Sequence, residues 1–156
     1  MGKIDSAERA RRGAAAEDLA SCYLRLRGCT IVGRNVRAGG GEIDLIARTG
    51  DWLLLVEVRY RETVAFGHPA ETVCGTKARS LARAARAYVA RGIGGAQCWR
   101  LDVVTVVLEK GGEARVQHYP AAVTMDGGWV GEGSFHRGPL TRKGPAYSFP
   151  SAPESP

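Results

Sequence analysis

The chain has 156 residues and a formal charge of +6, which comes from 22 basic and 16 acidic side chains. This length suits one compact domain, and a composition of 44% hydrophobic and 24% charged residues excludes a wholly disordered or fibrous protein. The sequence lacks the run of about 18 apolar residues that a membrane-spanning helix needs, and its first residues lack the apolar segment of a signal peptide. We therefore expect a cytoplasmic protein with no membrane partner.

The composition changes near residue 125. Residues 125–156 contain six Gly, five Pro and four Ser, and their charges cancel. Such a segment buries too little apolar area to offset the entropy of ordering it. We predict a folded domain over residues 1–124 and a flexible tail over residues 125–156, so the net charge of +6 belongs to the domain. This basic excess favours a polyanionic partner and does not identify it.

Helical and strand periodicities define the expected elements. A first helix begins with Ser6 as its N-cap and ends at Arg27, before Gly28. Gly50-Asp51 mark a tight hairpin turn. Strands are expected at residues 29–34, 42–48, 52–61, 99–108 and 114–119, with the glycine run 39–41 as a loop and a second helix over residues 76–91. The resulting order, αβββαβ(β), is typical of an α/β domain.

The tight turn fixes which residues of the hairpin face each other. If Gly50 and Asp51 are its two central residues, opposite residues have numbers that sum to 101. One face is then wholly apolar and pairs Ile43 with Val58, Leu45 with Val56 and Ala47 with Leu54. The other face pairs Ile46 with Leu55, Asp44 with Glu57 and Glu42 with Arg59. Two carboxylates are thus expected directly opposite each other.

Opposed carboxylates at Asp44 and Glu57 need a proton or a cation between them, because cross-strand neighbours lie about 4.5–5.5 Å apart at Cβ. One Mg²⁺ suits this spacing, since it takes one or two carboxylates and keeps its other positions for water or phosphate oxygens. The structural alternatives are a solvated Asp44 and a surface ion pair of Glu57 with Arg59 or Arg61. The functional interpretation is favoured because Glu57 follows the apolar run 53–56, where an unpaired charge is costly.

Two further acids, Glu17 and Asp102, lie outside the hairpin. Glu17 lies at the border of the first helix's apolar face, as either a boundary charge or a third acid that reaches the hairpin. The spacing fits both roles. Asp102 lies within the strand segment Arg100-Leu101-Asp102-Val103-Val104, and we expect it to be a paired structural acid.

Four motifs carry a family resemblance. They are Arg12-Gly13-x-x-Ala16-Glu17-x-x-Ala20-x-x-Tyr23-Leu24, Gly41-Glu42-Ile43-Asp44-Leu45-Ile46-Ala47, Val56-Glu57-Val58-Arg59-Tyr60-Arg61 and Leu101-Asp102-Val103-Val104. Together they resemble the YraN-type family of bacterial proteins, over residues 11 to about 120. That family is similar to archaeal Holliday-junction resolvases and to the PD-(D/E)xK nuclease superfamily. The resemblance implies a restriction-endonuclease-like αβββαβ core, in which helices flank a mixed central sheet.

The resemblance also assigns roles to single residues. It makes Asp44 the motif Asp, Glu57 the acid of E-x-K and Glu17 the acid carried by a helix. Arg59 stands where the superfamily's pattern has Lys, and Lys77 at the start of the second helix is the other cation that could replace that Lys. We rank Arg59 first, because its guanidinium can hold a phosphate oxygen although it cannot act as a base. The expected metal ligands are Asp44, Glu57 and Val58.

These roles imply a hydrolase, namely an endonuclease that depends on Mg²⁺ or Mn²⁺ and acts on DNA, with branched DNA in repair or recombination as one substrate. The alternative is a nucleic-acid-binding module with the same fold and no turnover. Cleavage that depends on Asp44 separates the two. Both are compatible with a monomer or a homodimer.

Overall fold

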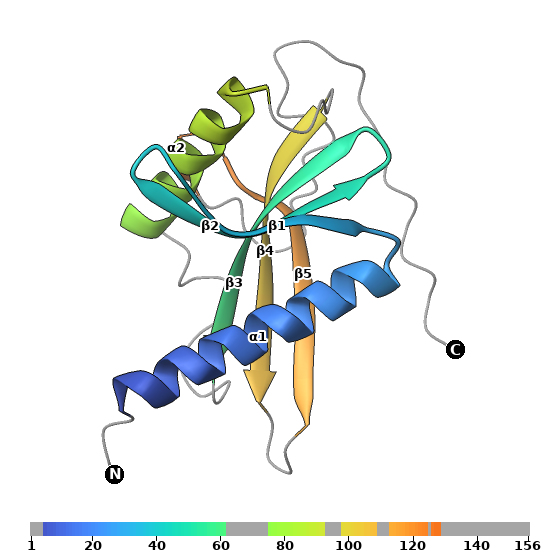
Figure 1. The fold of residues 1–156 in the computed structure, drawn as a ribbon, viewed down its shortest axis with the longest axis vertical. Helices are drawn as coiled ribbons and strands as arrows, with labels where there is room; N and C mark the ends of the chain where they lie inside the picture. Colours follow the sequence, from blue (N-terminus) through green and yellow to red (C-terminus); the bar gives the residue numbers. More distant parts are fainter. Residues whose placement is uncertain (1–4, 62–74, 93–97, 109–112, 125, 129–156) are drawn as a thin grey trace.

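The computed structural model describes residues 5–61, 75–92, 98–108, 113–124 and 126–128 (Figure 1). Within these ranges the elements are α1 (Ser6–Leu26), β1 (Thr30–Ala38), β2 (Gly41–Thr49), β3 (Trp52–Arg61), α2 (Thr76–Ala90), β4 (Cys98–Leu108) and β5 (Ala114–Val123). This order confirms the predicted α/β succession. Neither helix in these ranges combines the length and the apolar content required to cross a bilayer.

The strands form one mixed sheet in the order β1-β2-β3-β4-β5. β3 and β4 are parallel, and the other neighbours are antiparallel. α2 lies between the parallel strands in the chain, as the crossover connection that a parallel pair requires. β4 has a partner on each side, in agreement with its nearly continuous apolar sequence.

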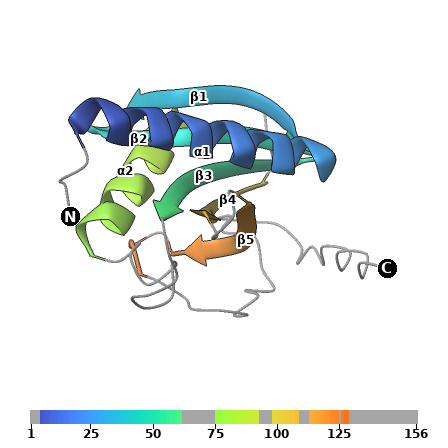
Figure 2. The ribbon, with the colours of Figure 1, turned by 90° about the horizontal axis from the view of Figure 1, so that it is seen from below.

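The two helices cover opposite faces of this sheet (Figures 1 and 2). α1 packs with Ala16, Ala20 and Leu24 against Leu45, Ala47, Leu54, Val56, Val104 and Val106. α2 packs with Ala78, Leu81, Ala82, Ala84, Ala85 and Tyr88 against Ile43, Ile46, Leu53, Leu55, Leu101 and Val103. Along β3, side chains of successive residues enter the two clusters in turn, as strand geometry requires: Leu53 and Leu55 join the α2 cluster, and Leu54 and Val56 the α1 cluster. The arrangement confirms a mixed sheet flanked by helices, consistent with the restriction-endonuclease-like core.

Several elements have ends that differ from the prediction, most clearly the start of α1 and the ends of β1 and β5. α1 begins at Ser6, so its N-cap is Asp5 rather than Ser6. β1 continues to Ala38, because the glycine run is the tight turn of a second hairpin and not a loop. Gly39 and Gly40 have φ angles of 55° and 74° in this turn, a backbone region that glycine enters without strain. β5 continues to Val123, past the predicted end.

The β1–β2 turn packs directly on α2. A Cβ atom on Gly39 would lie 3.0 Å from the carbonyl oxygen of Arg83, and one on Gly41 would lie 2.8 Å from that of Ser80. Only glycine therefore allows this close approach of backbone to helix. Nε of Arg83 donates a hydrogen bond of 2.8 Å to the carbonyl oxygen of Gly39 and holds the turn in place.

β1 and β2 change faces together at Asn35 and Asp44. Along a regular strand, residues two apart share a face, yet Ile43 joins the α2 cluster and Leu45 the α1 cluster. The prediction that Ile43 and Leu45 share one face is therefore wrong. Val36, opposite Ile43, also packs on the α2 cluster, and the preceding Asn35 has a left-handed φ of 47°. This change of face lets the end of the hairpin follow α2.

The pairing of β2 with β3 confirms the predicted register over its regular part, from Thr49↔Trp52 to Leu45↔Val56. In the ladder of the described residues, the predicted pairs beyond Leu45 are absent: Ile43–Val58, Asp44–Glu57 and Glu42–Arg59. Instead, Ile43 and Glu42 continue their pairing with β1, opposite Val36 and Arg37, while β3 continues beside β4. The reason is that β2 bends towards α2. The two strands separate at Asp44 and Glu57, and the candidate site lies in this opening.

Of the predicted tail, residues 126–128 lie within the described ranges. They fold back on Thr124, whose N–H donates to the carbonyl oxygen of Gly128 over 2.8 Å. A Cβ atom on Gly127 would lie 2.6 Å from Cγ of Arg79, so this turn lies against α2. The remainder of residues 125–156 lies outside the described residues, and the domain boundary at residue 124 stays a prediction.

Candidate metal centre

Asp44 lies where β2 leaves β3. Its Oδ2 accepts a hydrogen bond of 2.8 Å from the backbone N–H of Val58. The side chain thereby bridges the separating strands and fixes the carboxylate at the opening. Val58 has no polar side chain, so it can serve as the predicted metal ligand only through its carbonyl oxygen.

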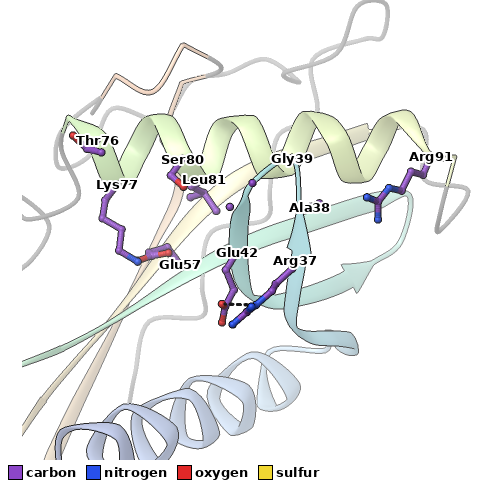
Figure 3. A pocket seen from close by; sticks show the side chains of 12 residues that line it. Arg37, Ala38, Gly39, Glu42, Glu57, Thr76, Lys77, Ser80, Leu81 and Arg91 are labelled. Atoms are coloured by element: carbon purple, nitrogen blue, oxygen red, sulfur yellow. Dashed lines mark ion pairs between the residues drawn. The ribbon is translucent and has the colours of Figure 1, made fainter. Parts of the chain in front are cut away.

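Glu57 comes from β3 and has 3% of its side chain exposed. It follows Leu53 and Leu55 on the face that α2 covers. Its Oε1 lies 3.5 Å from Nη1 of Arg59 and 3.3 Å from Nζ of Lys77. Figure 3 shows the Lys77 side chain extending from α2 to Glu57. Both cations suggested by the sequence therefore meet the same carboxylate oxygen.

Glu17 approaches the opening from α1. Nδ2 of Asn35 donates a hydrogen bond of 3.1 Å to its Oε2. Burial raises the pKa of Glu17, the Asn35 hydrogen bond lowers it, and the charges of Asp44 and Glu42 raise it further. The charge of Asp44 is thus among the influences on Glu17, and the two roles that the spacing left open both remain predictions.

Burial, together with the negative charge of Glu57, raises the pKa of Asp44 from its ordinary 3.8 to about 7. The Val58 N–H and the positive charge of Lys77 oppose this rise without cancelling it. An acid that titrates near neutrality is incompletely neutralised by the groups around it, and it gains from either a proton or a cation. Asp44 is therefore a buried acid whose own environment favours its protonated form, beside a Glu57 that Arg59 and Lys77 contact.

The donor set fits Mg²⁺ or Mn²⁺. Carboxylate and carbonyl oxygens are the ligands that these ions prefer, and Mg²⁺ commonly takes only one or two protein carboxylates. Among the described residues, no three His, Cys, Asp or Glu side chains gather closely enough to hold an ion by themselves. A metal here would rest on Asp44, Glu57 and the Val58 carbonyl, with water or substrate oxygens completing its coordination.

A cleft of about 830 Å³ opens beside Glu57, between the β1–β2 turn and α2 (Figure 3). The backbone of residues 39–41 forms one wall. The charged residues that line the cleft are Arg37, Glu42, Glu57, Lys77 and Arg91. Oε2 of Glu42 lies 3.5 Å from Nε of Arg37. Arg37 is thus the cross-strand partner of Glu42, a position that was predicted for Arg59. Of the two cations that contact Glu57, Lys77 lines the cleft and Arg59 does not.

A second acid, Asp102, lies on the α1 face of the sheet among close partners. Nε of Arg100 lies 2.8 Å from its Oδ1, and Nε2 of His118 lies 2.7 Å from its Oδ2. The N–H of Ala121 donates to Oδ1 over 2.8 Å. Burial alone would raise the pKa of Asp102, but Arg100, His118 and Ala121 hold it below its ordinary value. This confirms the predicted role of Asp102 as a paired structural acid.

Sequence reasoning missed Asn35 and the cleft wall at residues 39–41. At position 35, the residue type was a partial signal for a left-handed backbone, because Asn enters that region more easily than most residues. Its position within a strand concealed this signal. The contact between Asn35 and Glu17 spans 18 residues of sequence and depends on how α1 docks on the sheet, which no local pattern encodes.

The family model described as "Uncharacterised protein family UPF0102" matches residues 16–106, a range that contains Glu17, Asp44, Glu57, Arg59 and Lys77. The chain belongs to this family. A UPF0102 protein of Syntrophotalea carbinolica is 39% identical over 120 residues, which cover 77% of this chain and 97% of the relative. A UPF0102 protein of Anaeromyxobacter dehalogenans is 46% identical over 116 residues, which cover 74% and 85%. One of Beutenbergia cavernae is 42% identical over 106 residues, which cover 68% and 90%. These matches confirm the family resemblance.

Proposed function

We propose that this UPF0102 protein is a divalent-cation-dependent endonuclease that acts on DNA. The observation that carries the proposal is the adjacency of two carboxylates: burial and the charge of Glu57 raise the pKa of Asp44 to about 7, and Glu57 lines a cleft whose walls also hold Arg37, Lys77 and Arg91. The family description states no activity. The proposal therefore depends on this geometry and on the resemblance to PD-(D/E)xK nucleases.

Each residue of the centre has a defined task in phosphodiester hydrolysis. A bound Mg²⁺ or Mn²⁺ supplies a Lewis acid for a phosphate oxygen and lowers the pKa of the attacking water. Asp44 and Glu57 bind this ion, with the Val58 carbonyl as a further donor. Glu17, half-buried near Asp44, can accept a proton from the water. Lys77 presents its charge in the cleft, where it can bind a phosphate oxygen as negative charge increases there.

The charge of α2 supports nucleic acid as the substrate. Arg79, Arg83 and Arg86 are exposed at successive turns of this helix, and Arg37 and Arg91 line the neighbouring cleft. Guanidinium groups along one side of a cleft contact phosphates without reading base sequence, and such binding weakens as salt rises. This distribution suits a substrate recognised through its backbone, such as duplex or branched DNA.

The second candidate function is a nucleic-acid-binding module without turnover. Two observations favour it: Arg59 replaces the superfamily's Lys, and Glu57 already contacts two cations of the chain itself. A guanidinium cannot act as a base at any relevant pH. If Arg59 and Lys77 neutralise Glu57 completely, the metal gains little by binding and the fold keeps only its basic surface.

A nuclease panel tests the proposal. Single-stranded, duplex, flap and four-way DNA are incubated with the protein and Mg²⁺ or Mn²⁺, and chelation by EDTA serves as blank. We expect cleavage that is lost in Asp44→Asn and in Glu57→Gln. Asp51→Asn, which removes an exposed acid at the hairpin turn, is the matched control and should cleave as the wild type does. Salt-sensitive DNA binding without cleavage would select the second candidate function, and absence of both would exclude the two.

The same panel ranks the two cations. The sequence-based order makes Arg59→Ala the most damaging change, Lys77→Ala a milder one, and Arg59→Lys a variant that keeps much of the turnover. In the structure, both side chains reach the same oxygen of Glu57, and Lys77 is the one that lines the cleft. Wild-type cleavage by Arg59→Ala, together with loss in Lys77→Ala, would move the catalytic role to α2.

A further inference from the structure

Asn35 lies at the point where β1 changes faces. The residue before it, Arg34, contacts Asp18 of α1, whereas the residue after it, Val36, packs on the α2 cluster. Adjacent strand residues normally alternate, so the neighbours of Asn35 on either side would share a face in a regular strand. The φ of 47° at Asn35 accompanies this departure, and β2 makes the matching change at Asp44. Asn35 and Asp44 are therefore at the same level of the hairpin.

The side chain of Asn35 is exposed and contacts Glu17 of α1. Its Nδ2 donates over 3.1 Å to Oε2 of Glu17. The donor is a neutral amide, so it fixes the direction of the carboxylate without neutralising its charge, whereas an Arg or Lys there would compete with a bound cation. The neighbouring pair of Arg34 with Asp18 shows the other solution, a charged contact of 2.6 Å whose acid is 70% exposed.

We propose that Asn35 is a positioning residue, whose amide holds the Glu17 carboxylate towards Asp44 so that Glu17 acts with the metal centre. This inference rests on the proposed function. It adds to that function a residue on β1 that belongs to none of the family motifs quoted above. The left-handed backbone at Asn35 serves the same purpose, because it sets the direction of the side chain while Val36 turns to the opposite face.

A purely structural role for Asn35 makes a different prediction. If the left-handed backbone were the whole function, Gly would replace Asn with no loss, since Gly enters this region without strain. Asn35→Gly therefore separates the two roles, as it keeps the backbone and removes the amide. We expect it to fold with a melting temperature within a few degrees of the wild type, and to lose about tenfold in turnover or Mn²⁺ affinity, the size typical of an outer-shell contact to a metal site.

A double-mutant cycle provides the test. Asn35→Gly, Glu17→Gln and the double variant are compared in kcat, KM and Mn²⁺ affinity, with Asp18→Asn as matched control on the same helix. We expect the two single variants to lose kcat or Mn²⁺ affinity by similar factors with KM for DNA unchanged, and the double variant to lose no more than either alone. The Asn35 side-chain amide resonance should also shift in Glu17→Gln and stay in place in Asp18→Asn.

The outcomes distinguish the inference from the proposed function. If the wild type binds Mn²⁺ and cleaves, and Glu17→Gln is impaired while Asn35→Gly is not, the positioning role is wrong and the nuclease proposal stands. Losses that multiply in the double variant would also overturn the positioning role, because the two residues would then act independently. A wild type that neither binds Mn²⁺ nor cleaves DNA overturns the proposed function, and the inference with it.

Discussion

The Asp102 cluster lies on the α1 face of the sheet and the pair Asp44 and Glu57 lies where β2 leaves β3, and the two differ in the charges that surround them. Asp102, on the α1 face, contacts Arg100, His118 and the N–H of Ala121, and its pKa lies below the ordinary value despite complete burial. Asp44, beside the deeply buried Glu57, has a pKa raised to about 7 by burial and by that neighbouring charge. The partners of Asp102 outweigh the effect of burial on its pKa, whereas those of Asp44 do not.

Under the proposed function, the Asp102 cluster serves stability and the pair Asp44 and Glu57 serves metal binding. A buried acid with all its partners behaves as a structural unit, and removing one partner is costly. An incompletely neutralised pair costs free energy of folding unless something from outside the chain completes it. Of this second pair, Glu57 lines the cleft between the β1–β2 turn and α2. Substitutions of one acid in each cluster should therefore change stability in opposite directions.

The largest expected effect is at Asp102. Asp102→Asn leaves Arg100 buried without its counter-charge, so we expect the free energy of unfolding to fall by about 3–5 kcal/mol. Urea unfolding followed by circular dichroism at pH 7 measures this, with Asp51→Asn as the exposed control. A loss below about 1 kcal/mol would show that the Asp102 cluster is not the structural unit that its contacts indicate.

Asp44→Asn should change the free energy of unfolding in the opposite direction. The Asn Oδ1 can still accept the Val58 N–H, while the charge that opposes Glu57 is removed. In metal-free buffer at pH 8, we expect the free energy of unfolding to rise by roughly 1–4 kcal/mol. The upper end of this range corresponds to the rise in the pKa of Asp44 from 3.8 to about 7. A stability equal to or below that of the wild type would contradict an incompletely neutralised centre.

The hairpin register was predictable, because Gly50-Asp51 fix the turn and side chains alternate along each strand. So was the role of Asp102, since an acid inside an apolar strand needs buried partners. The bend of β2 at Asp44 was not, because it depends on the contact of Gly39 and Gly41 with α2, far along the chain. Local patterns thus located Asp44 and Glu57, while tertiary packing decided how they meet.

The pH dependence of stability should separate the clusters again. Because the folded pKa of Asp44 exceeds its ordinary value, the folded state binds more protons than the unfolded chain between about pH 4 and 7. The metal-free wild type therefore loses stability as pH rises through this window, relative to Asp44→Asn. Asp102 acts in the opposite sense, since its lowered pKa gives a stabilisation that is lost as pH falls below its ordinary value. Urea unfolding at pH 5, 6, 7 and 8 measures the difference, and parallel curves for the two proteins would refute it.

The smallest expected effect is at Lys77. Its side chain is 59% exposed, and Arg59 remains beside Glu57 when Lys77 is removed. We expect Lys77→Ala to change the free energy of unfolding by less than about 1 kcal/mol, as exposed ion pairs usually do. A larger loss in urea unfolding would mean that Lys77 completes the centre by itself, and would favour the module without turnover.

Calorimetric titration of Mn²⁺ into metal-free protein at pH 7 tests the central claim most directly. The account predicts one binding event in the wild type and in Asp51→Asn. Binding should release protons, because the cation displaces the proton that Asp44, with a pKa of about 7, partly holds at this pH. Titrations in buffers of different ionisation enthalpy detect this release. The account predicts loss of the binding event in Asp44→Asn and in Glu57→Gln. Absence of binding in the wild type, or equal binding in Asp44→Asn, would contradict the claim that this pair is completed by a divalent cation.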